Sequence, residues 1–250
     1  MKRELLERCR TEVFDMLPAE YDEQKTKMPE ALPFLDTCAP DTRLRFPELS
    51  RTVSFPRGTL CLRAREANDR IFFLLKGKAA VYNLTRCGKR KILFVLGNGS
   101  LVNESLTGTV SNIYCETLEP SRFQVIGQKD LLSLMEQDFL LTRSLLACQE
   151  RKIWRLEHQL KNTIGSIYLE RKLAAKLWKL ARDFGVPTEK GILIDMDLSI
   201  TFLADLLGAP RETTSRVCRR LSKLELIRTE RKKVYVPSPA ALSRFYRTTS

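Results

Sequence analysis

Two arginines and a glutamate lie close together in the segment Arg211–Arg216, directly after the tripeptide Gly-Ala-Pro. In a helix, Glu212 and Arg216 lie one turn apart on one face, with Arg211 in the same first turns. An arginine donates two hydrogen bonds to O6 and N7 of guanine, and a glutamate accepts one from N4 of cytosine. These side chains therefore predict base reading in a DNA major groove. The alternative is a solvated helix face with an ordinary Glu212–Arg216 ion pair.

The surrounding segment, Leu198–Leu224, predicts two short helices joined by a tight turn. The hydroxyl of Ser199 can cap the first helix by accepting from an unpaired backbone N–H. Gly208 can end that helix in the left-handed conformation, and Pro210 can start the next one, where its missing N–H costs nothing. A helix-turn-helix follows from these signals, with the second helix as the recognition helix.

A hairpin with a basic tip is expected after the second helix, over residues 226–236. Such a hairpin makes the unit a winged helix-turn-helix, with lysines at the tip that reach backbone phosphates. The predicted DNA-contact residues are Ser199, Arg211, Glu212, Thr213, Ser215, Arg216, Lys232 and Lys233.

The composition of the 250 residues agrees with a globular protein that binds a polyanion. Hydrophobic residues make up 43% and charged residues 29%, and the formal net charge is +13. Such a charge favours nucleic acid first, with a membrane surface, an acidic protein or a merely basic surface as alternatives. The start MKRELLERCR lacks the apolar region of a signal peptide, and no apolar run approaches the roughly 20 residues of a membrane span. We therefore expect a cytoplasmic protein with no membrane partner.

The seven cysteines are dispersed without a CxxC pair, and the chain has one histidine, His158. This pattern argues against a zinc, iron–sulfur or haem site, so we expect no metal or other cofactor and reduced thiols. Neither a Ser/His/Asp set nor a phosphate-binding glycine loop is visible, and a single histidine limits acid–base chemistry. The chain is therefore not expected to be an enzyme.

The predicted fold class is α+β, with four regions in order. Residues 1–48 form an irregular, partly helical lead-in, and residues 49–137 contain short β-rich runs separated by turns, which predict a β-roll for effector sensing. Residues 138–165 form a long helix, and residues 166–250 form the winged helix-turn-helix.

The long helix has apolar residues that alternate in steps of three and four, as in the seam of a coiled coil. The seam positions are Phe139, Thr142, Leu146, Gln149, Ile153, Leu156, Leu160, Thr163 and Ile167, of which the polar ones make it imperfect. The pattern indicates a homodimer, and the alternative is a core helix packed against the β-roll.

The order of these parts, over residues 50–237, resembles the Crp/Fnr family of bacterial transcription regulators. The segment IFFLLKGKAAVYNLTRCGKRKILFVLGNGSLVNES is similar to the family's cyclic-nucleotide-type β-roll. LADLLGAPRETTSRVCRRL resembles its helix-turn-helix, including the RExxxR pattern of the cyclic-AMP receptor protein. The resemblance implies a homodimer that binds double-stranded DNA at a palindromic TGTGA-like site, responds to a small-molecule effector and works with RNA polymerase.

The sensor segment resembles one branch of the family more than the others. Glu104 stands where the family has a ribose-binding glutamate, but Ser111 and Asn112 stand where an arginine would hold the phosphate, so cyclic AMP is not expected. The segment GNGSLVNESLTGTVSNIYCETLEPSR resembles the halorespiration regulators, which bind chlorinated phenols between the roll and the dimer helix. This implies an aromatic, halogenated effector and an effector pocket formed by Asn103, Glu104, Asn112 and Tyr114, with Arg155 or His158 from the long helix.

Two alternatives remain open from the sequence. The pocket positions also fit a strand-end turn and core packing. The whole chain also fits a small-molecule-binding or thiol redox-sensing module whose basic C-terminal region does not read sequence.

Overall fold

The computed structural model describes residues 32–103, 105–108, 110–161 and 169–247. Residues 1–31 of the predicted lead-in and residues 162–165 of the predicted long helix lie outside these ranges. The described chain begins with a short 3-10 helix (Pro33–Thr37) and the helix α2 (Pro40–Leu49). The described part of the predicted, partly helical lead-in thus contains the ten-residue helix α2, which tolerates Pro40 in its first turn and Pro47 in its last.

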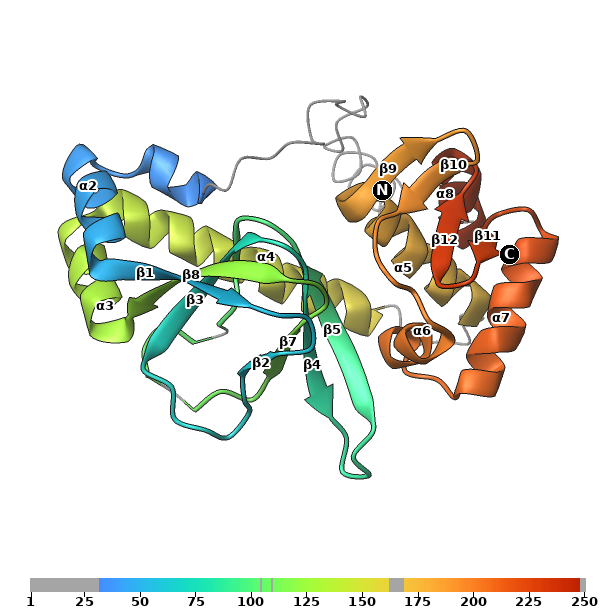
Figure 1. Cartoon of the computed structure of the whole chain (residues 1–250), viewed down its shortest axis with the longest axis horizontal. Helices are drawn as coiled ribbons and strands as arrows, with labels where there is room; N and C mark the ends of the chain where they lie inside the picture. The colour runs from blue at the N-terminus through green and yellow to red at the C-terminus, as the bar shows by residue number, and fades with distance from the viewer. Residues whose placement is uncertain (1–31, 104, 109, 162–168, 248–250) are drawn as a thin grey trace, which may run out of the picture.

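The β-rich region forms the predicted roll from two four-stranded sheets (Figure 1). Its strands are β1 (Ser50–Phe55), β2 (Leu60–Leu62), β3 (Arg70–Lys76), β4 (Ala79–Leu84), β5 (Arg90–Leu96), β6 (Ser100–Leu101), β7 (Tyr114–Thr117) and β8 (Ser121–Gly127). The strand orders are β1-β8-β3-β6 and β2-β7-β4-β5, and the paired strands are antiparallel. The two-residue strand β6 was not predicted.

Alternation along the strands divides the side chains between separate cores. On β3, Phe72 and Leu74 enter the core between the two sheets, together with Val81 of β4. Ile71 and Phe73 point the other way, toward a core that also contains buried side chains of α2 and of the two helices after the roll. This two-residue period gives each sheet a second buried face.

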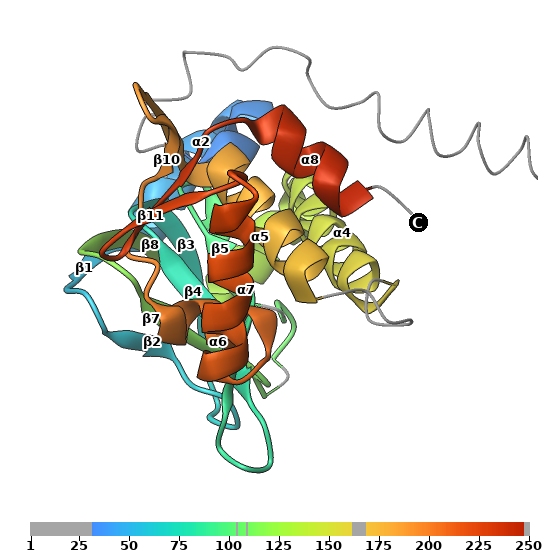
Figure 2. The same cartoon turned by 90° about the vertical axis from the view of Figure 1, so that its right-hand side faces the viewer.

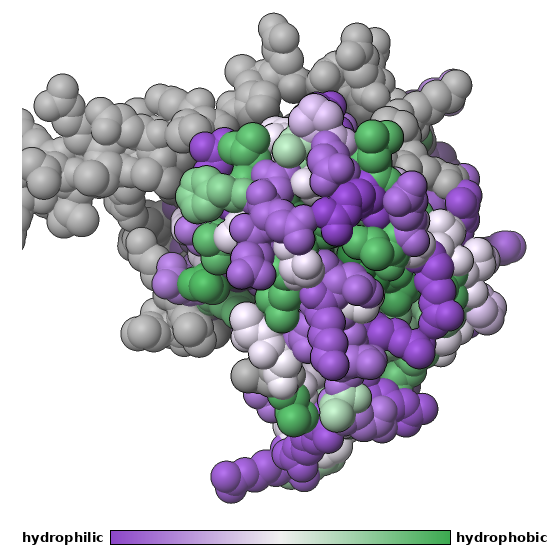
Figure 3. All heavy atoms as spheres, turned by 90° about the vertical axis from the view of Figure 1, so that its left-hand side faces the viewer, coloured by the Kyte–Doolittle hydropathy of each residue, from purple (hydrophilic) through white to green (hydrophobic). Residues whose placement is uncertain are grey.

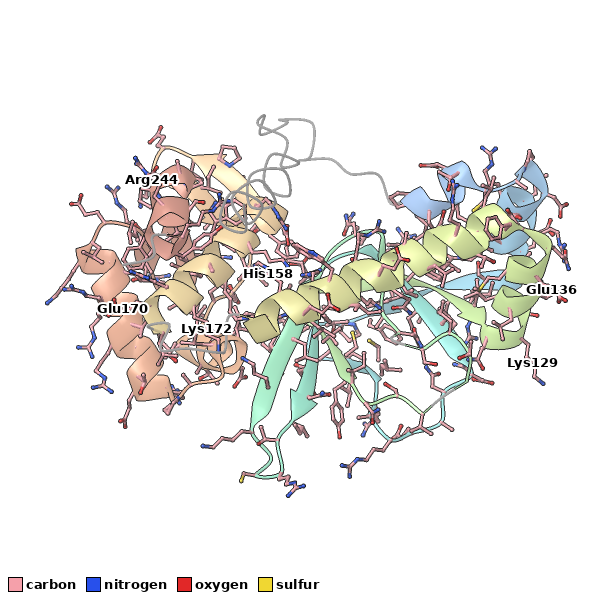
Figure 4. All side chains as sticks on the ribbon, turned by 180° about the vertical axis from the view of Figure 1, so that it is seen from behind. Lys129, Glu136, His158, Glu170, Lys172 and Arg244 are labelled. Carbon is pink, nitrogen blue, oxygen red and sulfur yellow. The ribbon has the colours of Figure 1, made fainter. Side chains whose placement is uncertain are left out.

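Two helices follow the roll, α3 (Gln128–Gln137) and α4 (Phe139–Lys161). Asp138 separates them and accepts hydrogen bonds from the backbone N–H of Ala39 (2.8 Å) and the hydroxyl of Thr42 (2.7 Å). Leu141 and Leu145 are fully buried against the roll. The long helix α4 therefore lies along the roll with one apolar face, as Figure 4 shows from behind.

The C-terminal region contains α5 (Leu169–Phe184), β9 (Gly185–Thr188), β10 (Gly191–Ile194), α6 (Ile200–Leu207), α7 (Arg211–Lys223), β11 (Arg228–Glu230), β12 (Lys233–Val236) and α8 (Pro239–Arg247). Its four strands form one sheet in the order β11-β12-β10-β9. The predicted hairpin is confirmed by β11 and β12, whereas β9 was not predicted because it contains Pro187. That proline lies on an edge strand, where a missing N–H is tolerated.

The C-terminal region packs on the outer face of the β2-β7-β4-β5 sheet (Figures 1 and 2). Tyr82, Ile92 and Val95 of the roll share one buried cluster with apolar residues of α5, α6 and α7. The ring of Phe184 lies against Gly97, where an added Cβ would come within 2.8 Å of it. The roll and the C-terminal region are therefore continuous through a shared core.

Candidate nucleic-acid interface and sensor region

The turn between α6 and α7 has the predicted local geometry. The side chain of Ser199 caps α6 by accepting from the backbone N–H of Phe202 at 3.1 Å. Gly208 ends α6 in the left-handed conformation, with φ of 73°. Pro210 precedes the first residue of α7, and its carbonyl accepts from the hydroxyl of Thr214 at 3.0 Å. These interactions fix the angle at which α7 leaves the turn.

One face of α7 is buried and the other carries exposed charged groups. Thr214, Val217, Cys218 and Leu221 are buried in the core. Arg211, Glu212 and Arg216 are exposed, whereas Thr213 and Ser215 are half-buried beside them. Within the described chain, no ion pair engages any of these three charged side chains, so the Glu212–Arg216 pair of the alternative interpretation is not formed. The first turns of α7 thus present exposed charged groups that form no ion pair among the described residues, although Nη2 of Arg216 lies 3.5 Å from the hydroxyl of Thr213, to which it donates.

A cleft of about 220 Å³ separates the recognition helix from the wing. Ser215 and Arg219 line it from α7, and Arg231 and Lys233 line it from the wing. Arg231 has a φ of 56° at the turn between β11 and β12, which forms the basic tip of the wing. Cations on both sides of a groove of this kind suit a strand of phosphates.

The other predicted wing lysine, Lys232, borders a cleft between the C-terminal region and the roll. A second cleft, of about 240 Å³, is lined by Ser199 and Lys232 of the C-terminal region and by Arg57 of the roll. Asp197 lies at this cleft and accepts from Nη1 of Arg57 at 2.9 Å and pairs with Nζ of Lys233 at 3.4 Å. These hydrogen bonds from Arg57 and Lys233 lower the pKa of the Asp197 carboxyl. Of the two predicted wing lysines, Lys233 is therefore already paired.

The side chain of Asn103 is bound within the roll. Its Oδ1 accepts from the backbone N–H of Phe72 at 2.8 Å, and its Nδ2 donates to the carbonyl of Arg70 at 2.9 Å. Both partners belong to β3, so the amide continues the edge of the sheet beyond β6. This placement matches the strand-end role that the sequence left open for Asn103.

The remaining sensor candidates lie in different surroundings. Glu104 is outside the described residues. Asn112 is exposed, and Tyr114 stacks on Tyr82, with ring centroids 5.2 Å apart. The guanidinium of Arg155 lies over the ring of Phe94 at 4.9 Å, and burial lowers its pKa. His158 is exposed on α4 near the end of the helix and stacks on Trp154 at 5.3 Å (Figure 4). The ring contacts of Tyr114, Arg155 and His158 are thus made with three different partners, Tyr82, Phe94 and Trp154.

Two residues of α4 that the sequence reasoning missed hold the sensor segment. Nζ of Lys152 donates to the carbonyls of Val102 and Asn103 at 3.2 and 2.7 Å. Nε2 of Gln149 donates to the carbonyl of Asn103 at 3.3 Å. Gln149 and Lys152 follow the buried Leu145 by four and seven residues, which places them on the inner face of the helix. This helical spacing is the feature of the sequence that could have identified them.

The described cysteines carry free thiols, and two of them meet in the roll. Cys61 donates to the carbonyl of Cys115 at 3.3 Å, and a side-chain hydrogen bond from Cys115 lowers the pKa of the Cys61 thiol. That same hydrogen bond and burial raise the pKa of Cys115.

Within the described ranges, no group of three His, Cys, Asp or Glu side chains has an arrangement that could hold a metal ion. In those same ranges no helix combines the length and apolarity needed to cross a membrane.

Comparison with known families agrees with this architecture at both ends of the chain. The cyclic nucleotide-binding domain matches residues 52–138, and the Crp-like helix-turn-helix domain matches residues 171–245. The chain belongs to the Crp/Fnr family of transcription regulators. It is a DNA-binding regulator with a cyclic-nucleotide-binding-type domain joined through α4 to its winged helix-turn-helix.

Individual relatives of this Crp/Fnr regulator are distant. The global nitrogen regulator of a Nostoc species is 26% identical over 201 residues, which cover 79% of this chain and 86% of the relative. The structure of FixK2 from Bradyrhizobium japonicum matches with a TM-score of 0.69 at 17% identity, covering 80% of this chain and 99% of FixK2. OCPA-complexed CprK matches with a TM-score of 0.60 at 20% identity, covering 82% and 94%. CprK is thus a distant structural neighbour, and its likeness establishes the shared fold alone.

Proposed function

We propose that this Crp/Fnr regulator acts as a homodimer that reads a palindromic, TGTGA-like DNA site under the control of a small organic effector. The observation that carries the DNA reading is that Arg211, Glu212 and Arg216 lie exposed on the first turns of α7 and form no ion pair with any described residue. A free arginine fork and a free carboxylate at this position can each select a base, whereas a paired set would first have to break its ion pair.

The homodimer is supported by apolar residues that α4 leaves in solvent. Phe139, Leu146 and Ile153 are spaced seven residues apart and are 74%, 52% and 55% exposed. A heptad spacing keeps them on one seam, which a second copy of α4 can cover. Figure 3 shows the end of the molecule formed by α2 and α3, where hydrophobic residues are scattered among hydrophilic ones. In a dimer formed through α4, the two symmetric recognition helices would bind half-sites about one helical turn apart.

DNA binding is tested by fluorescence anisotropy on a TGTGA palindrome and on a scrambled duplex of the same composition. We expect the palindrome to bind at least about a thousandfold more tightly at physiological salt. Equal affinity for both duplexes would contradict sequence reading and would favour the alternative module whose basic region does not read DNA.

Dimerisation is tested by light scattering on the Ile153→Asp variant. We expect this variant to be a monomer, because a charge in the seam must be desolvated. Leu84→Asp is the matched control, since Leu84 is 47% exposed but lies in the roll, away from α4. A dimer that persists in Ile153→Asp would contradict the seam.

The effector proposal follows the resemblance of the sensor segment: a small organic ligand, with halogenated phenols as one candidate class, between the roll and α4. Lys152 supplies a cation beside the Asn103 carbonyl at this junction. The proposal also includes RNA polymerase as a partner, a cytoplasmic location and no bound metal or haem. A thermal-shift comparison of halogenated phenols, other aromatic acids and cyclic nucleotides tests the effector, because a ligand of the native state must raise the apparent stability.

A thiol redox sensor is the second candidate, favoured by the contact between Cys61 and Cys115. If this contact controls DNA binding, reductant should change the affinity of the wild type but not that of Cys61→Ser. Identical affinities with and without reductant in the wild type would eliminate this candidate.

A further inference from the structure

Five cationic side chains gather where the roll, α4 and α5 meet. This cationic cluster consists of Lys91 on β5, Arg155 on α4, and Lys172, Lys176 and Lys179 on α5. Nζ of Lys176 donates to Oε1 of Gln159 on α4 at 3.4 Å, and Nε2 of Gln159 donates to the carbonyl of Leu93 on β5 at 3.2 Å. Figure 4 shows Lys172 on α5, beside the end of α4 that carries His158.

The centre of the cationic cluster has an excess of positive charge. The charged groups that act on Lys176 are Lys91, Lys172, Lys179 and Arg155, all of them cations. Burial and these neighbours lower the pKa of Lys176 to about 7, and burial lowers that of Lys179 to about 8. Among the described residues, no carboxylate forms an ion pair with any member of the cluster. Like charges held together without a counter-ion destabilise the native state, so the cluster favours an anion.

Carboxylates act on the cluster only at its edges. Asp183 acts on Arg155 and Lys179, and Asp205 acts on Lys91. Asp183 is paired with Arg182 at 2.8 Å, and Asp205 lies 3.8 Å from Nε of Arg90. Both are therefore shared with other arginines, and neither acts on Lys176.

An unsatisfied donor lies in the same place. Among the described residues, Nε of Arg155 is buried without a hydrogen-bond partner, while its guanidinium lies over the ring of Phe94. A buried donor without an acceptor costs free energy, and native structures rarely leave one. Within the described ranges, the buried donor without an acceptor and the cations without an ion-paired carboxylate thus lie at the same junction.

We propose that the cationic cluster binds a small phosphate-bearing anion. Lysine ammonium groups are point charges that approach from several directions, which suits a tetrahedral oxyanion better than a planar carboxylate, for which a bidentate arginine is preferred. A dianion would also offset more of the cluster's charge than a monoanion. Its donors come from the roll, the long helix and the DNA-binding region, so the bound anion holds these parts together.

The site is separate from the proposed DNA-reading face, and neither proposal depends on the other. Lys172, Lys176 and Lys179 lie on α5, whereas the base-reading residues lie on α7. The anion would bind more tightly when α5 is packed against the roll and α4 than when it is not. Such a difference in affinity would increase the population of the packed arrangement of the sensor and DNA-binding regions.

The test is a thermal-shift titration of the full-length protein with sodium phosphate, against sodium chloride at equal ionic strength. At a tenfold excess over Kd we expect phosphate to raise the melting temperature by about 3–5 °C. Lys176→Gln/Lys179→Gln should lose this shift, and Lys176→Arg/Lys179→Arg should retain it. An arm with adenosine 5′-monophosphate identifies the source: a larger shift indicates an organic phosphate, and an equal or smaller one indicates the free ion.

Two control variants separate the cluster from other cations. Lys129→Gln removes an exposed lysine on α3, and Arg211→Ala removes a cation of the DNA-reading face; both should keep the full phosphate shift. Loss of the shift in Arg211→Ala, equal shifts in wild type and the double glutamine variant, or no shift in the wild type would each overturn the proposal. Phosphate binding is measured without DNA. A protein that fails to bind DNA sequence-specifically can therefore still show the phosphate shift, and the two proposals are tested separately.

Discussion

Arg57 in the turn after β1 donates to Asp197 before α6 across 2.9 Å, joining two residues that are 140 positions apart. Two further contacts along this interface also place a cation on the roll and a carboxylate on the DNA-binding region. Lys78 of the roll pairs with Asp195 at 3.1 Å, and Arg90 of the roll lies 3.8 Å from Asp205. In each case a cation of the roll meets an aspartate of the DNA-binding region, so the two halves are electrostatically complementary.

The strength of this contact can be measured by a double-mutant cycle with Arg57→Ala and Asp197→Ala. Both side chains are partly in solvent, at 60% and 32% exposure, so we expect a coupling of about 0.2–1 kcal/mol. Thermal or urea unfolding gives the free energy of unfolding of the four proteins. Arg51→Ala, at an exposed position of β1, is the control and should show no coupling with Asp197→Ala. A zero coupling for Arg57 would contradict the ion pair.

Acid should weaken the same interface. Because Arg57 and Lys233 lower the pKa of Asp197 in the native state, its contribution is present above the unfolded-state pKa of about 3.8 and is lost as pH falls through the lower native value. The wild type should therefore lose stability more steeply than Asp197→Asn below about pH 4. Parallel stability curves for the two proteins between pH 5 and pH 2.5 would disprove this assignment.

Local signals account for the parts of the fold that the sequence predicted. The cap at Ser199 and the left-handed Gly208 act within one turn of chain, so their geometry follows from residue type alone. Strand alternation in the roll is a local property too. In contrast, β6 pairs only Ser100 and Leu101 with β3, a contact that exists because of the tertiary fold. Two residues give no periodic signal.

Site residues whose roles depend on a distant partner were harder to predict. Asn103 suits a ligand pocket by type, but its amide is taken by the backbone of Arg70 and Phe72. Lys176 reads as an ordinary helix lysine, because no local pattern shows that β5 and α4 bring further cations to it. The exposed face of α7 was predictable, since the amphipathic period alone determines which side of that helix is buried.

The base-reading residues make a position-specific prediction. Arg211→Ala and Arg216→Ala should each weaken specific binding by about 1–3 kcal/mol and relax one operator position, because each arginine can read one guanine. Lys223→Ala, an exposed cation at the other end of α7, is the control and should leave operator preference unchanged. Anisotropy on single-base operator variants measures the effect. Equal losses on specific and random DNA would refute base reading by that arginine.

The two wing lysines should differ in their salt effects. Lys232 is exposed at the tip, whereas Lys233 is paired with Asp197 at 3.4 Å. Lys232→Ala should reduce the slope of log K against log salt by about 1, as expected for one lost phosphate contact. Lys233→Ala should change the slope less, since its charge is already partly compensated. The reverse order would show that the wing rearranges on DNA and releases Lys233.

The cationic cluster predicts an unusual effect of a lysine substitution on stability. The native pKa of Lys176, about 7, is far below its usual 10.5, so the unfolded chain binds the proton more tightly. The destabilisation is complete below about pH 7 and disappears as pH rises toward 10.5. Without an added divalent anion, Lys176→Met should be more stable than wild type by at least about 1 kcal/mol at pH 6, and the gap should close toward pH 10.

Sulfate, which remains a dianion across this range, should narrow the gap at pH 6 by stabilising only the wild type's charged cluster. Chemical unfolding of the wild type and Lys176→Met at both pH values, with sulfate or chloride at equal ionic strength, measures the free energies of unfolding that these comparisons need. Lys129→Met is the control, because this exposed lysine lies on α3 and should show neither the gain in stability nor the sulfate effect. A Lys176→Met variant less stable than wild type at pH 6 would show that Lys176 is compensated within the chain and needs no anion.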